Sequence, residues 1–116
     1  MAFISRNATN NFYTECNDKT PNSIANANGK AHYAMSRGNA ANYDKYRNYV
    51  KTNVAIASVG LPTEKLYACG AKLPVITASD RQVRYVFLFS YLTQTEVNNV
   101  IGIMETYLDA IGSGLI

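Results

Sequence analysis

Apolar and polar positions alternate between residues 46 and 58, YRNYVKTNVAIAS, as in a β-strand with two unlike faces. The apolar set is Val50, Thr52, Val54 and Ile56. The opposite set, extended backward along the same alternation, is Arg47, Tyr49, Lys51, Asn53 and Ala55. The pattern predicts one sheet face that covers a core and one that is polar and basic.

Shorter stretches predict further strands around this one. Residues 1–29, rich in Asn and Thr, are expected to form a β-hairpin followed by loops. KAHYAMS begins at residue 30 and predicts a strand, and RGNAANYDKYR supplies the residues for a turn. Sheet strands are expected across residues 30–91, interrupted by a long loop at 59–78, with a last strand that ends near Phe89.

The clearest helix signal follows that last strand. Thr93 and Glu96 have the spacing of a capping box, in which the two side chains satisfy free backbone N–H groups. Gly112 and Gly114 are expected to end the helix, which gives it the range 93–112. Its apolar positions recur at helical spacing: Val97, Val100, Ile101, Met104, Tyr107, Leu108 and Ile111.

Strands followed by one terminal helix predict a single α+β domain over residues 1–116, with an antiparallel sheet and the helix on one face. One helix of this length cannot cover a sheet of five to seven strands. Either much of the sheet is in contact with water, or a second copy of the chain supplies a second helix.

Composition adds one constraint. Only 16% of the residues are charged while 47% are hydrophobic, so the surface is rich in uncharged polar residues or is covered by other chains. The net charge of +3 suits an anionic partner.

No stretch has the length and apolarity of a membrane span, and the N-terminus has no signal-peptide pattern, so a cytosolic site of synthesis is expected.

Enzymatic motifs are not found in the sequence. There is no phosphate-binding glycine loop, nucleophile elbow or paired CxxC, and the acidic residues are scattered, so neither an enzyme, a cofactor nor a metal site is predicted. His32 has no catalytic partner in a recognisable motif. Cys16 and Cys69 are interpreted as reduced thiols, with a cross-link from Cys69 to a neighbouring subunit as the alternative.

The basic sheet face is the strongest functional candidate. Lys and Arg beside aromatic rings bind RNA by contacting phosphates and stacking on unpaired bases. The candidate RNA-binding residues are Arg47, Tyr49, Lys51, Asn53, Arg81, Arg84 and Tyr85, with Ser36 and His32 as weaker candidates. The alternative is an ordinary solvated sheet face whose charges serve solubility.

Two stretches resemble the coat proteins of single-stranded RNA bacteriophages of the levivirus type. GAKLPV at residues 70–75, followed by a strand that ends in LTQTE, is similar to that family's loop, last strand and Thr-capped helix. NYDKYRNYVKTNVAI is similar to its turn and Tyr-x-Val/Ile-Lys strand. The resemblance covers about Lys30 to Asp109 and not the N-terminal residues. The chain departs from the family in a longer loop at 60–72 and in stopping before a second helix.

The resemblance implies an interlocked homodimer with one continuous sheet and helices on one face. It further implies an icosahedral shell around the RNA genome, assembled in the host cytoplasm, and binding of an RNA hairpin that represses translation. Lys51 matches a phosphate- or base-contacting lysine, and Arg81 falls where the family often has a base-stacking tyrosine. Cys69 lies in the loop that surrounds the symmetry axes, where some relatives have disulfides between subunits.

Two hypotheses follow. The first is a viral coat protein, with itself and single-stranded RNA as partners and no membrane partner. The second is a cellular dimeric α+β nucleic-acid-binding module that does not form shells. Particle formation separates them.

Overall fold

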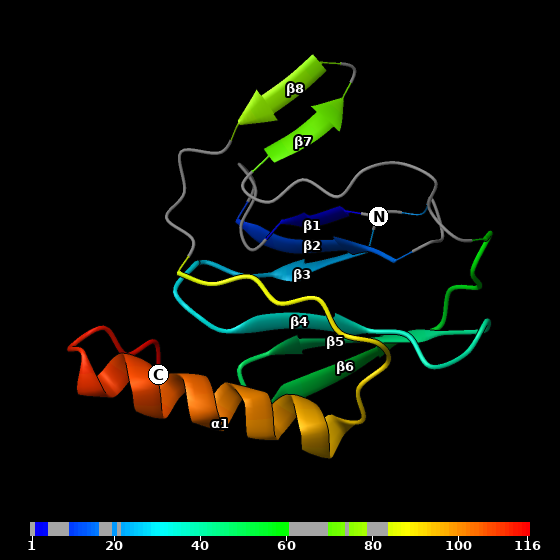
Figure 1. The fold of residues 1–116 in the computed structure, drawn as a ribbon. Helices are drawn as coiled ribbons and strands as arrows, with labels where there is room; N and C mark the ends of the chain where they lie inside the picture. Colours follow the sequence, from blue (N-terminus) through cyan, green and yellow to red (C-terminus); the bar gives the residue numbers. More distant parts are fainter. Residues whose placement is uncertain are drawn as a thin grey trace.

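The computed structural model describes residues 2–4, 10–16, 20, 22–60, 70–73, 75–78 and 84–116. These residues form three layers stacked in space (Figure 1). An N-terminal sheet lies above a central sheet, and helix α1 (Gln94–Ala110) lies below it. A separate hairpin pairs two further strands beyond the N-terminal sheet. The α+β plan expected from the sequence is confirmed.

All sheets are antiparallel and pair strands in chain order. The N-terminal sheet contains β1 (Ala2–Ile4), β2 (Asn11–Glu15) and β3 (Asn22–Ala25). The central sheet contains β4 (Tyr33–Ser36), β5 (Tyr43–Arg47) and β6 (Val50–Val54). The separate hairpin contains β7 (Gly70–Leu73) and β8 (Val75–Ala78), which fall within the range expected to be a loop.

The continuous strand expected at residues 46–58 is wrong. It is divided between β5 and β6 by a two-residue turn at Asn48 and Tyr49, and the register pairs Arg47 with Val50. Asn48 adopts a φ of 54°, a left-handed conformation that asparagine tolerates better than most residues. The side chain of Asn48 also accepts a hydrogen bond from the backbone N–H of His32 at 2.9 Å, which ties the turn to the start of β4.

The last strand is also not formed as expected. Residues 84–93 have no regular secondary structure, and we call residues 84–92 the edge segment. Strand formation requires a neighbouring strand that satisfies the backbone hydrogen-bonding groups. Within the described part of the chain, no hydrogen bond from the backbone of residues 84–89 is found.

Helix α1 follows its sequence signals closely. Thr93 is its N-cap, and both hydrogen bonds of the capping box with Glu96 are present. The helix ends before Gly112, whose φ of 70° favours glycine. Of the expected apolar stripe, Val97, Ile101 and Leu108 are buried, whereas Tyr107 and Ile111 are more than half exposed.

The central sheet packs on both faces. Cys16, Tyr43 and Val54 form a cluster between the central sheet and the N-terminal sheet, which we call the sheet cluster. On the opposite face Tyr46 packs against Val97 and Ile101 of α1, which we call the helix cluster. The N-terminal sheet and helix α1 therefore cover opposite faces of the central sheet.

Candidate nucleic-acid interface

Lys51 and Asn53 lie exposed on β6, and both contact the same acid. Lys51 Nζ is 2.9 Å from Asp44 Oδ2, and Asn53 Nδ2 donates to Asp44 Oδ1 at 2.8 Å. The hydrogen bond to Asp44 raises the pKa of Lys51 above its ordinary value. The lysine is therefore charged, but a phosphate that approaches it competes with Asp44.

The face that carries Lys51 differs from the expected one. Lys51 pairs with Tyr46 across the hairpin, and Tyr46 is the residue that packs against α1. Paired residues in an antiparallel ladder share a face, so Lys51 lies on the helix side of the sheet. The face expected to be polar and basic therefore also packs against a helix, through Tyr46. The N-terminal sheet occupies the face where Val54 lies.

Arg47 and Tyr49 are not brought onto the face of Lys51, because the turn at residues 48 and 49 breaks the alternation. Arg47 pairs with Val50 and therefore lies on the other face, where its Nη2 donates to the carbonyl of Asn28 at 3.3 Å. Tyr49 is in the turn itself and is 46% exposed. The predicted set of four residues on one face is thus divided among two faces and a turn.

The candidates from the last expected strand are also divided. Arg84 is exposed. Tyr85 is half-buried, and its hydroxyl is hydrogen bonded to Nδ1 of His32. Burial, with a smaller contribution from Glu105, raises the pKa of Tyr85 to about 12, so the phenol stays protonated at neutral pH. Arg81 and Cys69 lie outside the described residues.

The two weaker candidates, His32 and Ser36, are buried. His32 is 2% exposed and contacts Glu105 through Nε2 at 2.6 Å. Ser36 Oγ donates to the carbonyl of Leu92 at 2.6 Å and accepts from its N–H at 3.0 Å. Both side chains are engaged in links within the fold, so neither is open to RNA in this structure.

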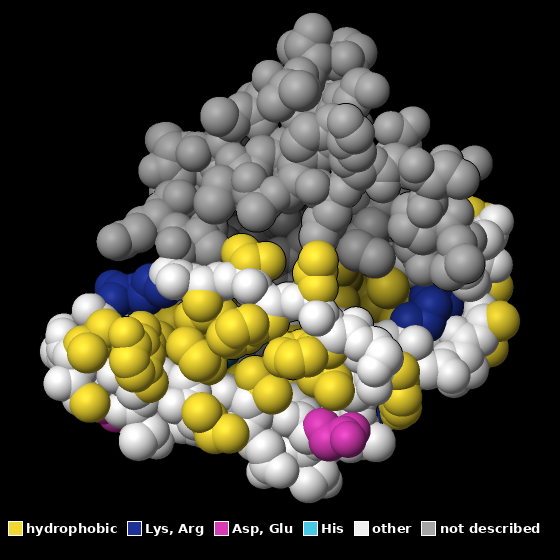
Figure 2. Space-filling model, viewed as in Figure 1, with side chains coloured by type: hydrophobic (Ala, Val, Ile, Leu, Met, Phe, Trp, Pro, Cys, Tyr) yellow, Lys and Arg dark blue, Asp and Glu magenta, His cyan; other side chains and the backbone are white. Residues whose placement is uncertain are grey.

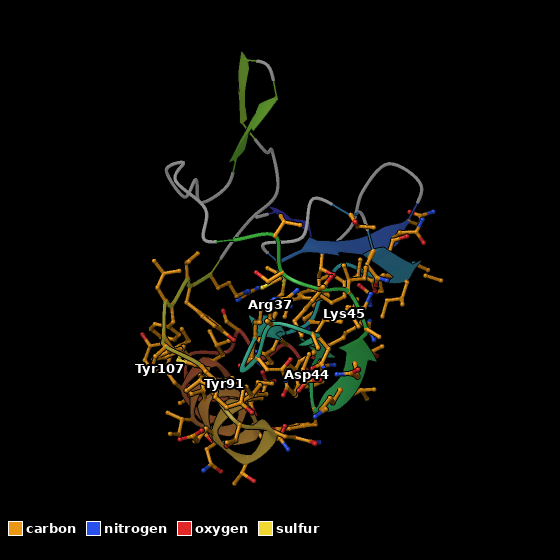
Figure 3. All side chains as sticks on the ribbon, turned by 90° about the vertical axis from the view of Figure 1, so that its right-hand side faces the viewer. Arg37, Asp44, Lys45, Tyr91 and Tyr107 are labelled. Carbon is orange, nitrogen blue, oxygen red and sulfur yellow. The ribbon has the colours of Figure 1, made fainter. Side chains whose placement is uncertain are left out.

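A buried lysine was not anticipated from the sequence. Lys45 is 1% exposed, and its ammonium group donates to Oδ1 of Asn22 and lies 5.8 Å from the ring centre of Phe12. Burial lowers the pKa of Lys45. Figure 3 labels Lys45 and Asp44, neighbours in β5 whose side chains point to opposite faces. The alternation of side chains along β5 places Lys45 on the same face as the buried Tyr43, and this was the available signal for its burial. The signal was not used because lysine is rarely buried.

Arg37 is likewise held within the fold. Its guanidinium donates to the carbonyls of Cys16 at 2.9 Å and Ile56 at 3.0 Å, and it lies 5.0 Å from the ring centre of Tyr43. These contacts join the ends of the two sheets. Arg37 and Lys45 therefore serve packing. The exposed cations in the described ranges are Lys30, Lys51 and Arg84, of which Lys51 and Arg84 are among the predicted RNA-binding residues.

Exposed apolar side chains form the other conspicuous surface. In the edge segment, Val86, Phe87, Leu88 and Phe89 are 49–75% exposed. On α1 the exposed apolar residues are Ile103, Tyr107 and, at its C-terminal end, Ile111. Figure 2 shows apolar side chains gathered across the described region above α1 and on the adjoining side of the helix. A surface of this kind is typical of a region that another protein covers.

Comparisons with known proteins identify no relative: no family model, no curated protein and no solved structure matches the chain. Among the described residues, no helix is long and apolar enough to cross a membrane. Nor do the described residues contain a group of three or more His, Cys, Asp or Glu side chains that could hold a metal ion.

Proposed function

We propose that this chain is a coat protein that associates with copies of itself, forms an icosahedral shell and packages single-stranded RNA without catalysing a reaction. The observation that carries the proposal is the edge segment, which combines exposed apolar side chains with a backbone that, at residues 84–89, makes no hydrogen bond to another described residue. The resemblance at residues 70–96 supports the same assignment. The particle would assemble in the host cytoplasm and become the virion.

The edge segment favours a second copy as the occupant of this surface. Rings of Tyr85 and Phe87 are 5.2 Å apart, and those of Phe87 and Phe89 are 5.7 Å apart. The three rings of residues 85, 87 and 89 thus form a row of neighbouring aromatic side chains along the segment. An extended edge with free N–H and C=O groups pairs readily with another strand, and the same edge of a second copy satisfies it through a two-fold axis. The resulting dimer would have one continuous sheet.

The exposed helix residues extend that interface. Ile103 is 69% exposed and Tyr107 57% exposed, on the same helix that carries the buried Val97 and Ile101. Covering apolar area contributes roughly 25 cal/mol per Å² of surface removed from water. With only 16% charged residues, the chain has little charge repulsion to oppose association. Helices of two copies packed beside the joined edges would account for both surfaces.

RNA binding rests on the remaining exposed cations and the net charge of +3. Lys51 and Arg84 are the predicted residues that lie exposed for phosphate contacts, with Asn53 on the face of Lys51 as a polar contact and Tyr49 in the adjoining turn as an aromatic one. Phosphate contacts make affinity fall by about 0.7 log unit per log unit of salt for each single-strand phosphate neutralised. Binding of a hairpin and translational repression belong to the same proposal.

Particle formation tests this function. The chain is expressed alone, and its mass is measured by size-exclusion chromatography with light scattering, with absorbance at two wavelengths to detect nucleic acid. Large particles that contain RNA support the coat function. A stable dimer that binds RNA but forms no particle at any salt concentration supports the cellular nucleic-acid-binding module instead.

A further inference from the structure

Two side-chain links hold the edge segment to strand β4. At one end the hydroxyl of Tyr85 is hydrogen bonded to His32, the residue before β4 begins. At the other end Leu92 is bonded through its backbone N–H and C=O to Oγ of Ser36, the last residue of β4. The backbone of residues 84–89 makes no hydrogen bond to another described residue, so these two links are the hydrogen bonds that join the segment to β4 and the residue before it.

The first link continues into helix α1. His32 Nε2 is 2.6 Å from Oε2 of Glu105, and both side chains are buried. An ionised carboxylate accepts only, so Nε2 carries the proton that it donates to Glu105. On its other side Nδ1 is hydrogen bonded to the hydroxyl of Tyr85, which can either donate or accept. Hydrogen bonds thus run without a break from Glu105 through His32 to Tyr85.

Glu105 also holds the residues after the helix. Its other oxygen, Oε1, accepts hydrogen bonds from the backbone N–H of Leu115 at 2.7 Å and of Ile116 at 2.8 Å. The carboxylate of one buried residue thus connects three parts of the chain, namely the end of the described sequence, α1 and, through His32, the edge segment. No comparable connection passes through Ser36, whose hydroxyl bonds to Leu92 on both sides.

We propose that Glu105, His32 and Tyr85 form a proton-sensitive latch, in which protonation of the Glu105 carboxylate releases the edge segment and residues 115–116 and thereby weakens association between copies. The latch regulates the interface of the proposed function and rests on it. A protonated carboxyl group loses its charge, so its bonds to the three N–H donors weaken and its own O–H faces the Nε2 proton. Of the two side-chain links described above, the edge segment then keeps the one at Ser36.

The pH range follows from the direction of the pKa shift. Burial raises the pKa of Glu105, but hydrogen bonds from Ile116, His32 and Leu115 outweigh it, so the pKa lies below the ordinary value. The stabilisation is therefore complete above the ordinary glutamate pKa and is lost as the pH falls through the lowered one. The titratable groups around the carboxylate are His32 from the sheet, Tyr85 beyond it and Asp109 on the next turn of α1, beside Gly114.

Hydrogen exchange measured by mass spectrometry tests the latch in the full chain. Exchange is followed from neutral pH down through the range below the ordinary glutamate pKa, with correction for intrinsic rates. In peptides from residues 84–92 and 113–116 it is expected to rise about tenfold or more once Glu105 is protonated. Peptides from β5 and β6 are expected to stay protected. An unchanged edge segment at acid pH would overturn the proposal.

Two variants assign the step to the carboxylate. Glu105→Gln keeps an acceptor for Leu115 and Ile116 but does not titrate. The rise in hydrogen exchange at acid pH, which we call the pH step, is therefore expected to disappear in this variant. Ser36→Ala removes the other link and is expected to raise exchange at both pH values while leaving the step intact. A step of wild-type size in Glu105→Gln would contradict the proposal.

A second measurement needs no variant, in case Glu105→Gln does not fold. The chain has one histidine, so the imidazole signals in an NMR spectrum belong to His32 without further assignment. These signals are expected to shift as Glu105 titrates, below the ordinary glutamate range. A His32 signal that is constant through that range while the protein stays folded would overturn the latch.

The mass of the protein at both pH values separates the two proposals. An edge segment that opens at acid pH in a protein that is monomeric throughout would support the release of the segment by Glu105, but it would reject the coat function and with it the control of association. Particles that persist at acid pH with a protected edge segment would support the coat function and reject the latch.

Discussion

Two isoleucines of helix α1 provide a matched test of the fold and its exposed surface. Ile101 is 3% exposed and packs against Tyr46 and Val97, whereas Ile103, two positions later, is 69% exposed. Replacing a buried isoleucine with alanine costs about 2–5 kcal/mol, from lost burial and the cavity that remains. Alanine favours helix by a few tenths of a kcal/mol at both positions. The expected loss of unfolding free energy for Ile101→Ala is therefore about 2–4 kcal/mol.

Ile103→Ala is the control because it has the same chemistry on the same helix. An exposed substitution changes the stability of the folded chain by about 0.5 kcal/mol or less. If α1 contacts another copy through this face, Ile103→Ala should instead weaken association. Urea unfolding followed by helical circular dichroism, at several protein concentrations, separates the two contributions, because only association depends on concentration.

Equal losses for the two variants at low protein concentration would refute the assignment of the buried face of α1. A loss for Ile103→Ala alone would mean that the helix is rotated about its axis relative to the central sheet. An Ile103→Ala variant with unchanged stability and unchanged association would retain the fold but remove this side of α1 from the proposed interface.

Four further substitutions test three separate parts of the structure. Thr93→Ala removes the N-cap and should lower unfolding free energy by about 1 kcal/mol in urea, and an unchanged midpoint would exclude the capping box from stability. Val54→Asp places an unpaired charge in the sheet cluster and should abolish folding, so a folded variant by circular dichroism would contradict that packing. Lys51→Ala should reduce the slope of log affinity for RNA against log salt concentration by about 0.7. Asp44→Asn, which frees Lys51, should strengthen RNA binding. Identical slopes for Lys51→Ala and the wild type in filter binding would remove Lys51 from the interface.

Local signals in the sequence were sufficient for the helix. Thr93 and Glu96 satisfy each other's backbone at the first turn, and Gly112 supplies the left-handed conformation that ends the last turn. These interactions act within a few residues and do not depend on the rest of the fold. The burial of Val97 and Ile101 also followed from the helical period.

The division between β5 and β6 was not predicted because the apolar and polar alternation continues through the turn. In a hairpin, residues that pair across the strands share a face of the sheet. Arg47 and Val50 therefore lie on the same face, although one has an odd and the other an even residue number and continuous alternation would place them on opposite faces. Asn48 was the only local signal for the turn, and asparagine is also common in loops.

Contacts between distant residues could not be read from the sequence. His32 and Glu105 are 73 positions apart, and neither lies in a recognisable motif. The burial of Glu105 on a helix face expected to be apolar depends on His32 and on the backbone of residues 115–116. The edge segment has a strand-like apolar pattern, but a strand also requires a partner edge, and its own sequence does not specify which chain provides it.

The most direct test of the coat function is the mass and nucleic-acid content of the protein expressed alone, followed by negative-stain microscopy of the largest species. Uniform shells that contain RNA, and that are lost when Phe87 and Leu88 of the edge segment are replaced with serine, are the expected result. A folded, RNA-free monomer at every protein and salt concentration tested would contradict both self-assembly and RNA packaging.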